Sequence, residues 1–176
     1  MKRISMISAV AENGVIGANK DMPWSISTDL KFFRKTTTGK PVIMGRRTFE
    51  SICSSLGKPL PNRTNIVITR DRTYAHEGAE VVGNLKDALT FAEHVAEVEG
   101  VDEIMVVGGG QIYAEAMSSA STLYITRVHA TPEGDTCFPK IDASEWDLTE
   151  NTPFDRGEKD TADTSLEIYR RRGETC

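Results

Sequence analysis

The sequence predicts an α/β fold: a central, mostly parallel, twisted β-sheet flanked by helices, followed by a C-terminal antiparallel strand pair. Two observations favour this class. Short runs of β-branched and other apolar residues alternate with helical patterns along the chain, which favours a parallel sheet over a sandwich or a helical bundle. The length of 176 residues suits one domain, and no repeat, low-complexity tract or linker divides the chain. We therefore expect residues 1–176 to form a single domain.

The composition excludes several classes of protein. With 39% hydrophobic and 27% charged residues, the chain is not disordered, collagen-like or a coiled coil. A net charge of −5 does not suit nucleic-acid binding, which needs clustered Lys and Arg. No apolar run approaches the roughly 18 residues needed to cross a bilayer, and the basic start of the chain is expected to enter a strand, not a signal peptide.

The cysteines and histidines favour a cytoplasmic protein without a metal. The three cysteines form no CxxC pair, and the three histidines are scattered. Neither a disulfide framework nor a zinc site is supported by this spacing. We expect a cytoplasmic monomer whose partners are small molecules, with no metal, membrane or nucleic acid among them.

The first elements are a strand, a turn-rich segment and a helix. Residues 3–11 are mostly apolar and predict a strand. Residues 12–24 are rich in Gly, Asn and Pro, which are typical of turns. Apolar side chains at three-to-four spacing predict a helix over residues 25–37. Asp29 falls in its first turn, where the helix dipole favours an acid.

Strands and helices then alternate, and each is predicted from a β-branched run or a helical stripe. In chain order they are a strand at 41–44, a helix at 46–52, strands at 65–69 and 80–82, a helix at 84–98, a strand at 103–107, a helix at 111–117 and a strand at 123–129. The helix at 84–98 has the clearest stripe, and Asn84 is its expected N-cap. Two further strands are expected near 146–149 and 165–171, separated by a polar loop at 151–164.

Two strand-to-helix junctions are candidate phosphate-binding sites. Glycines at 108–110 let backbone N–H groups approach a phosphate closely. The full GxGxxG fingerprint is absent, so a plain tight turn is the alternative. At the other junction Arg46 and Arg47 can hold a phosphate through two guanidinium groups. The alternative there is a pair of exposed arginines on a short helix.

Asp29 is the third candidate. Residues 22–24, Met-Pro-Trp, precede it, and Leu30 and Phe33 lie beside it on the predicted helix. A carboxylate edged by apolar and aromatic groups can lose water and gain one specific partner. The alternative is a solvated acid that interacts only with the helix dipole.

These features recur in a fixed order along the chain. The motif at 15–24 is followed by Asp29, Phe33 and Thr37 at a characteristic spacing. Further blocks lie at residues 40–52, 59–65, 104–113, 123–126 and 134–139. Together they resemble the dihydrofolate reductase family, of the bacterial, single-domain type. Chance agreement over several ordered blocks is very improbable.

The resemblance implies an NADPH-dependent oxidoreductase that reduces 7,8-dihydrofolate to 5,6,7,8-tetrahydrofolate. Hydride reaches pterin C6 and a proton reaches N5, in a reaction that supplies one-carbon metabolism and is a target of antifolate inhibitors. Hydride donation is the chemistry of NADPH itself. By resemblance Asp29 binds the pterin 2-amino group and ring N3, and Thr126 bridges to Asp29 and the pterin. Met22 and Trp24 complete the catalytic set, with water admitted past Met22 as the favoured proton route.

The resemblance also implies a substrate site. The backbone carbonyls of Ile7 and Val107 are expected to face the pterin edge. Leu30, Phe33 and Ile52 are expected to form apolar walls. Arg63 is expected to hold the α-carboxylate of the glutamyl tail, a bidentate contact that suits Arg better than Lys.

The implied cofactor site surrounds NADPH from the nicotinamide to the 2′-phosphate. Ala9 and Ile16 are assigned to the nicotinamide carboxamide through their backbone groups, and Arg46 and Arg70 to the 2′-phosphate. The family often has a cis bond between the first two glycines of the triplet. The full set is Ala9, Ile16, Gly45, Arg46, Arg47, Thr48, Thr69, Arg70, Gly108, Gly109, Gly110, Gln111 and Ile112.

The chain departs from familiar members of the family in four places. Residues 53–56 look like an insertion that lengthens the rim near the substrate tail. Gln111 stands where some members have a cation, Phe49 replaces a common tryptophan, and Cys137 replaces a histidine or a similar group. None of these positions is expected to touch the chemistry directly.

Two other functions remain as alternatives. A pyrimidine reductase of riboflavin synthesis has the same fold and a nicotinamide site, but should lack both Asp29 with its preceding motif and Arg63. A non-catalytic pterin- or nucleotide-binding module is the second alternative. Nothing in the residues favours it, because the binding carboxylate and both phosphate turns are present.

Overall fold

A computed structural model describes residues 2–17 and 27–173 of the chain. The helices are α1 (Ser27–Thr37), α2 (Arg46–Leu56), α3 (Leu85–Glu99) and α4 (Gly110–Ala116). The strands are β1 (Arg3–Ala11), β2 (Val15–Gly17), β3 (Pro41–Gly45), β4 (Thr64–Ile68), β5 (Ala79–Val82), β6 (Glu103–Gly108), β7 (Thr122–Val128), β8 (Thr136–Cys137), β9 (Trp146–Pro153) and β10 (Thr164–Arg171).

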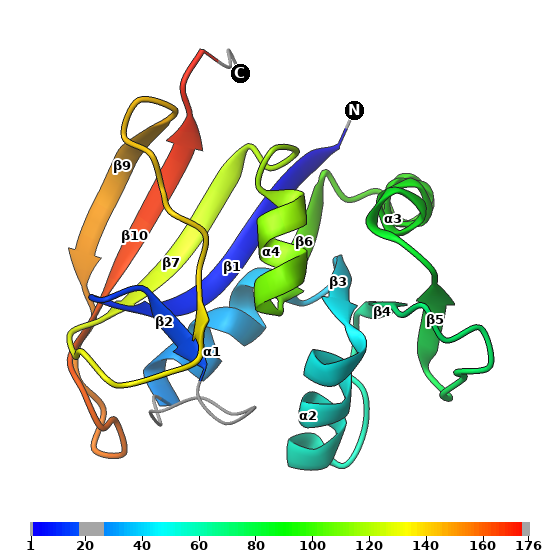
Figure 1. Cartoon of the computed structure of the whole chain (residues 1–176), viewed down its shortest axis with the longest axis horizontal. Coiled ribbons are helices and arrows are strands. Elements are labelled where there is room, and N and C mark those ends of the chain that lie inside the picture. Colours follow the sequence, from blue (N-terminus) through cyan, green and yellow to red (C-terminus); the bar gives the residue numbers. More distant parts are fainter. Residues whose placement is uncertain (1, 18–26, 174–176) are drawn as a thin grey trace.

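Eight of these strands form one twisted sheet in the order β5-β4-β3-β6-β1-β7-β10-β9 (Figure 1). The six strands from β5 to β7 in this order run parallel to one another. Only β10 reverses direction, because it pairs antiparallel with both β7 and β9. The predicted fold class, a mostly parallel sheet with a C-terminal antiparallel strand pair, is confirmed.

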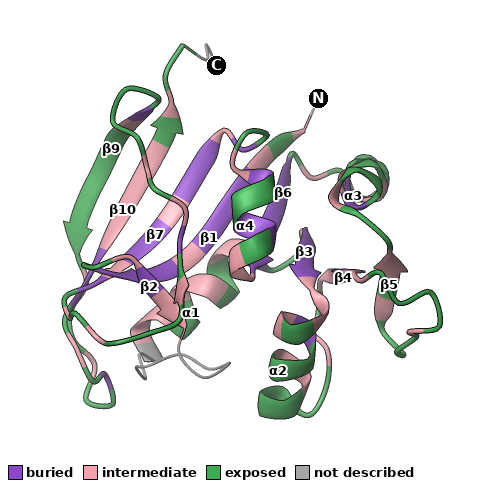
Figure 2. Cartoon of the chain, in the orientation of Figure 1, coloured by how far each residue is buried: buried purple, intermediate pink, exposed green. Residues whose placement is uncertain are grey.

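Two apolar clusters cover the two faces of the sheet. Successive side chains on a strand point to opposite faces, so the neighbours Met6 and Ile7 on β1 belong to different clusters. The Met6 cluster includes the buried residues of α3 and α4. The Ile7 cluster includes Phe49 of α2, with Phe33 of α1 packed against it. The central strands are buried, whereas β9 is largely exposed (Figure 2).

The helix predicted at 84–98 has the expected local signals. The side chain of Asn84 accepts a hydrogen bond from the backbone N–H of Asp87 at 2.8 Å, which is an N-cap. At the other end Gly100 has a positive φ of 69° and closes the helix through its N–H. Both ends of α3 are therefore encoded locally.

Three parts of the secondary structure differ from the prediction. Residues 12–24 were expected to form turns only, but β2 lies within them and pairs with β8 through Val15 and Cys137. The helix predicted at 46–52 continues to Leu56, so residues 53–56, which were expected to be an insertion near the substrate tail, form its last turn. Gly57 ends it with a φ of 76°. The polar loop begins later than expected, because β9 extends to Pro153.

Within residues 2–17 and 27–173, no helix is long and apolar enough to cross a membrane. The same residues contain no group of three or more His, Cys, Asp or Glu side chains arranged to hold a metal ion. Cys53 and Cys137 are free thiols.

Candidate active site

The two predicted phosphate-binding junctions lie side by side. β3 ends at Gly45 and leads into α2, and β6 ends at Gly108 and leads into α4. β3 and β6 are neighbours in the sheet, with Met44 paired to Gly108. In parallel α/β sheets, ligands bind at the carboxyl ends of the strands. The topology therefore brings the arginine and glycine motifs to one edge.

The second and third glycines of the triplet leave little room for a Cβ atom. A Cβ atom on Gly109 would lie 3.2 Å from Thr48 Oγ1, and a Cβ atom on Gly110 would lie 2.7 Å from Thr136 Cγ2. The Gly108–Gly109 peptide bond is cis, as the family resemblance implied. Neither Gly45 nor Gly109 provides a side-chain cap, and the first turns of α2 and α4 contain no acid. These features fit a phosphate held by backbone N–H groups.

Arg46 is fixed by its neighbours. Its Nε atom donates to Glu50 at 2.8 Å and its Nη1 atom donates to Asp71 at 3.2 Å. Its guanidinium carbon lies 4.2 Å from the ring centroid of Tyr74. The hydrogen bond with Glu50 is the main cause of a raised Arg46 pKa, and Asp71 adds to it. Sequence reasoning missed both acids, because neither was part of the glycine–arginine motif.

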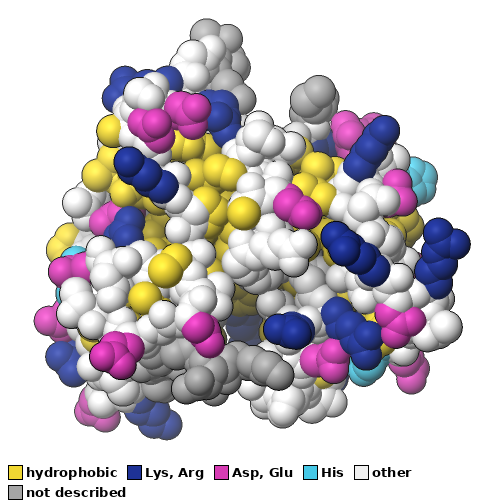
Figure 3. Space-filling model, viewed as in Figure 1, with side chains coloured by type: hydrophobic (Ala, Val, Ile, Leu, Met, Phe, Trp, Pro, Cys, Tyr) yellow, Lys and Arg dark blue, Asp and Glu magenta, His cyan; other side chains and the backbone are white. Residues whose placement is uncertain are grey.

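The remaining predicted cofactor residues occupy the same region in different ways. Arg47, Arg70 and Gln111 are exposed, whereas Ile112 is buried. Thr69 follows β4, where its backbone N–H donates to the Val82 carbonyl at 2.9 Å. In the space-filling view, basic side chains lie near the start of α2, beside a hollow in the surface (Figure 3). Of the two residues predicted to contact the nicotinamide, Ala9 lies on β1 and Ile16 on β2.

Asp29 and Thr126 come together from α1 and β7. Asp29 is half-buried in the first turn of α1, and Thr126 is 1% exposed. Burial raises the pKa of the Asp29 carboxyl to about 6. A hydrogen bond with the Thr126 side chain opposes this rise, and the negative charge of Asp160 adds to it. The Asp29 carboxyl is therefore not a fully solvated acid at the start of a helix.

A buried tyrosine lies beneath the predicted pterin edge. The hydroxyl oxygen of Tyr113 lies 2.6 Å from the Ile7 carbonyl oxygen and 2.8 Å from the Val107 carbonyl oxygen, so its single proton is shared between these two acceptors. Burial raises its pKa, so the group stays a donor. A carbonyl oxygen has two lone pairs, so it can accept from Tyr113 and from a second donor. Sequence reasoning did not single out Tyr113, although it follows the glycine triplet by three positions.

Arg63 lies beside the C-terminal end of α1, where it contacts Thr37. Its Nε atom donates to the Pro61 carbonyl at 2.9 Å, and its Nη1 atom donates to Thr37 Oγ1 at 2.9 Å. Thr37 in turn donates to the Phe33 carbonyl at 2.8 Å. Burial and the nearby charge of Arg34 lower the Arg63 pKa. Among the described residues, no carboxylate lies within ion-pair distance of Arg63.

The side chains predicted to form an apolar wall lie on α1 and α2. Leu30 is 57% exposed, an unusual position for a large apolar side chain. Phe33 and Ile52 are half-buried and pack on the Ile7 cluster. Phe32, which was not predicted, packs there too, with its ring 6.4 Å from that of Tyr124. The predicted catalytic residues Met22 and Trp24 lie outside the described residues.

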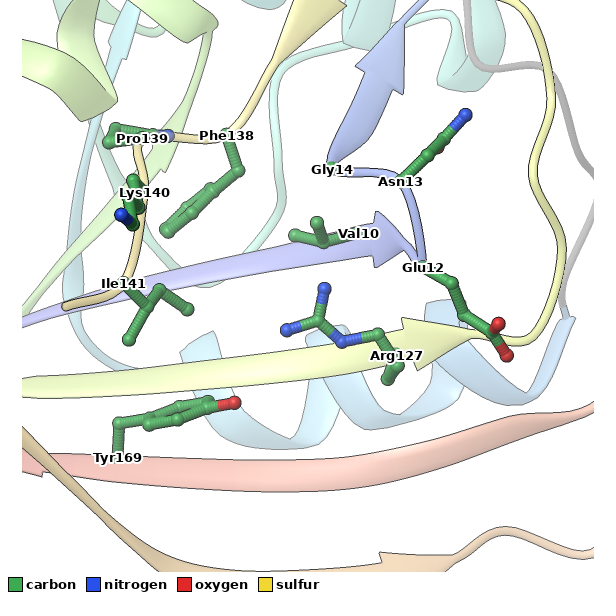
Figure 4. A pocket seen from close by; sticks show the side chains of 10 residues that line it. All are labelled: Val10, Glu12, Asn13, Gly14, Arg127, Phe138, Pro139, Lys140, Ile141 and Tyr169. Atoms are coloured by element: carbon green, nitrogen blue, oxygen red, sulfur yellow. The ribbon is translucent and has the colours of Figure 1, made fainter. Parts of the chain in front are cut away.

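A separate cavity of about 320 Å³ lies on the opposite face of the sheet (Figure 4). Arg127 points into it, and adjacent residues on a strand face opposite ways, so Thr126 points toward Asp29 instead. The Arg127 guanidinium is paired with Glu167 at 3.1 Å. This cavity contains none of the predicted site residues.

The fold and the site are those of an α/β enzyme with a nucleotide-binding edge. Known proteins agree. The family model described as dihydrofolate reductase matches residues 3–171. Dihydrofolate reductase of Bacillus subtilis is 40% identical over 169 residues, which cover 96% of this chain and 95% of the relative. That of Neisseria gonorrhoeae is 47% identical over 152 residues, covering 86% and 88%.

A solved structure supports the same conclusion. Dihydrofolate reductase from Enterococcus faecalis, complexed with NADP(H) and RAB-propyl, superposes with a TM-score of 0.81 at 35% identity. The match covers 97% of this chain and 96% of the other. The chain belongs to the dihydrofolate reductase family.

Proposed function

We propose that this protein catalyses the NADPH-dependent reduction of 7,8-dihydrofolate to 5,6,7,8-tetrahydrofolate, a step of one-carbon metabolism. The observation that carries the proposal is the half-buried Asp29 carboxyl beside Thr126, in a chain of the dihydrofolate reductase family. When bound, NADPH supplies the hydride that reaches pterin C6. The chain's own residues bind and orient the two rings and control charge around them.

Asp29 is assigned to the pterin. Its two carboxylate oxygens suit the paired donors of the 2-amino group and ring N3, and the hydrogen bond from Thr126 orients them. A cationic pterin is costly in an apolar cleft unless an opposite charge is beside it. Asp29 therefore favours the proton that N5 must gain. We assign Met22 to the entry of the water that delivers this proton, and Trp24 to the catalytic set.

The other substrate contacts follow from their positions. The Ile7 and Val107 carbonyls, which Tyr113 holds, are assigned to the pterin edge. Leu30, Phe33 and Ile52 are assigned to the apolar walls. Arg63 is assigned to the tail α-carboxylate, because its guanidinium is held in place by Pro61 and Thr37.

The glycine triplet fits its assignment to the NADPH pyrophosphate. A Cβ atom at Gly109 or Gly110 would meet the Thr48 or the Thr136 side chain, so glycine allows the close packing of this junction. We assign the pyrophosphate to the two junctions and the 2′-phosphate to Arg46 and Arg70. The nicotinamide carboxamide is assigned to Ala9 and Ile16. The full assigned set is Ala9, Ile16, Gly45, Arg46, Arg47, Thr48, Thr69, Arg70, Gly108, Gly109, Gly110, Gln111 and Ile112.

One assay separates the candidate functions. The purified chain is mixed with NADPH and dihydrofolate, and absorbance at 340 nm is followed. We expect a steady fall that depends on both compounds and is blocked by an antifolate. A fall only with a ribosylated pyrimidine would instead indicate the riboflavin-pathway reductase. Binding of dihydrofolate without any fall would indicate a non-catalytic module.

We also propose that the protein acts in the cytoplasm, as a monomer of one domain. The cysteine pattern supports the location, because the sequence contains no CxxC pair or disulfide framework. Light scattering of the purified chain tests the oligomeric state, and cell fractionation tests the location.

A further inference from the structure

The connection between β9 and β10 reaches back to the start of α1. Asp160, in this connection, is 5% exposed. Its Oδ1 atom accepts a hydrogen bond from the backbone N–H of Thr28 at 3.2 Å, and its Oδ2 atom accepts one from the Thr28 hydroxyl at 2.5 Å. The first N–H groups of a helix have no partner within the helix. A carboxylate 132 positions away in the sequence therefore caps α1.

Asp160 is itself held in place. The backbone N–H of Gly157 donates to Asp160 Oδ2 at 2.8 Å, and the Asp160 N–H donates to the Gly157 carbonyl at 3.1 Å. The guanidinium of Arg156 donates to the Asp160 carbonyl from Nε and Nη2, at 3.3 and 3.2 Å. These bonds make residues 156–160 a compact turn that presents the carboxylate to α1.

An apolar contact joins the same two segments. The ring of Phe154, at the start of the connection, lies 5.7 Å from the ring of Phe32 on α1. The backbone N–H of Phe154 donates to the Thr164 carbonyl at 2.9 Å, which closes the base of the connection. The connection is therefore docked on α1 by one apolar and one polar contact.

The docking point is next to the substrate-binding carboxylate, because Thr28 and Asp29 are consecutive. Two groups of the described chain act on the Asp29 carboxyl: the Thr126 side chain from β7, which lowers its pKa, and the Asp160 charge, which raises it. The Asp29 charge in turn helps to raise the pKa of Tyr113 of α4. The turn that contains Asp160 also holds the charged residues Arg156, Glu158 and Lys159, and Arg156 forms an ion pair with Asp163 at 3.4 Å. The Asp160 charge therefore opposes ionisation of the Asp29 carboxyl.

We propose that Asp160 is a positioning residue for Asp29: its carboxylate fixes the first turn of α1 and places a second negative charge beside the carboxylate that binds the pterin. The inference rests on the proposed function, since that function assigns Asp29 to the substrate. Asp160 touches neither substrate nor cofactor in this role. Its charge makes both a protonated pterin and a protonated Asp29 easier to form.

Three variants separate the cap from the charge. Asp160→Asn keeps an oxygen acceptor for Thr28 but removes the charge. Asp160→Ala removes both. Asp163→Asn is the matched control, because it removes an exposed charge from the same connection without touching α1.

The primary measurement is the titration of Asp29 itself. The full chain is labelled with aspartate carrying carbon-13 in the side-chain carboxyl, and the Asp29 signal is assigned by its loss in Asp29→Asn. We expect Asp160→Asn to lower the Asp29 pKa by about 0.5 unit or more, because a like charge is removed. Asp163→Asn should leave it unchanged. An unchanged Asp29 pKa in Asp160→Asn would overturn the inference, even if the enzyme reduces dihydrofolate normally.

Single-turnover hydride transfer with a deuterated nicotinamide supplies the second readout. In Asp160→Asn, the pH at the midpoint of the hydride-transfer rate profile should fall together with the Asp29 pKa. Asp160→Ala should also raise the KM for dihydrofolate about fivefold, because the turn that holds Asp29 loses its cap, and Asp160→Asn should restore most of this loss. Equal KM values in the Ala, Asn and wild-type proteins would overturn the positioning role. An Asp29 signal that shifts without any change in the kinetic profile would support the carboxylate contact but overturn the role of Asp29 in the proposed function.

Discussion

Asp29 and Glu103 are two carboxylates largely removed from water on the same face of the sheet, and they behave in opposite ways. Glu103 stands at the start of β6, where its side chain is 4% exposed. It receives hydrogen bonds from Lys40 at 2.7 Å, Arg3 at 3.1 Å and Ser5 at 2.5 Å. Burial raises the Glu103 pKa, but these bonds outweigh it and lower the pKa to about 2. Among the described residues Thr126 is the donor to Asp29, and the pKa of Asp29 is about 6.

The comparison shows that hydrogen-bond partners, and not burial alone, decide whether the pKa of a carboxyl shielded from water is raised or lowered. Tyr124 adds a fourth donor to Glu103, at 2.9 Å, so the chain itself supplies every partner that this group needs. A carboxylate satisfied by its own chain supports the fold, and removing one member of such a group is strongly destabilising. Asp29 is left with capacity for donors that a ligand brings, which is typical of functional sites.

Asp29→Asn should give the largest effect. The substitution keeps the shape of the side chain but removes the charge that supports a protonated pterin. We expect the hydride step at pH 7 to slow by about 4 kcal/mol, or roughly a thousandfold. The hydride rate of the variant should rise toward the wild-type rate as pH falls, because acid then protonates the substrate. Single-turnover rates with deuterated NADPH measure this step, and a wild-type rate at pH 7 would remove Asp29 from the mechanism.

Arg63→Ala extends the comparison to a cation that has no carboxylate partner among the described residues. If the ligand supplies the partner, dihydrofolate binding should weaken by about 3 kcal/mol. A pterin without a glutamyl tail should bind almost as before. Equilibrium fluorescence titration with both compounds measures the difference, and equal losses for the two would count against the tail assignment.

Glu103→Gln tests the other side of the comparison. Its folded pKa of about 2 lies below the ordinary value of 4.5, so its stabilisation is complete above pH 4.5 and is lost as pH falls toward 2. We expect the variant to lose about 3 kcal/mol of unfolding free energy at pH 7. The difference from wild type should narrow at pH 3, and the hydride rate should not change.

Urea unfolding at both pH values measures the loss in Glu103→Gln. The matched control is Glu97→Gln, because Glu97 is 78% exposed and pairs with Lys2 at 3.4 Å. An exposed pair of this kind contributes at most about 1 kcal/mol. Equal losses in the two variants would show that the buried cluster contributes no more than a surface pair.

Asp29→Asn should also stabilise the fold at neutral pH. The pKa of Asp29 is raised from its ordinary 3.8 to about 6, so folding the charged form is unfavourable above pH 6 and this penalty disappears as pH falls below 4. We expect the variant to gain about 2 kcal/mol of unfolding free energy at pH 8 and nothing at pH 4. A variant less stable than wild type at pH 8 would mean that Asp29 is satisfied by the chain, as Glu103 is.

Replacing Arg46 and Arg70 together by Gln should give the smallest effect, because both groups are at the surface and Arg46 already pairs with Glu50 and Asp71. We expect NADPH affinity to fall by about 1–2 kcal/mol while the slower rate with NADH stays almost unchanged. Steady-state kinetics with both cofactors measures the preference. An undiminished preference for NADPH would place the 2′-phosphate elsewhere.

Much of the fold could be predicted because its signals are local. The apolar run of β1 lies at Arg3–Ala11 as predicted, and the cap and stripe of α3 are contained in its own residues. The glycine triplet and the start of α2 could be placed at strand ends for the same reason. The roles proposed for these residues came from the order of motifs along the chain, which resembles one family.

What the sequence by itself determined is therefore the class of fold, the family, and the positions of Asp29, Arg63 and the two glycine-containing junctions. Only the tertiary structure decided which groups surround them. The pairing of β2 with β8 and the cap from Asp160 to Thr28 each join segments more than a hundred positions apart. The difference between Asp29 and Glu103 has the same origin. Both are single acids in the sequence, and their charges are set by donors and solvent that only the folded chain brings near them.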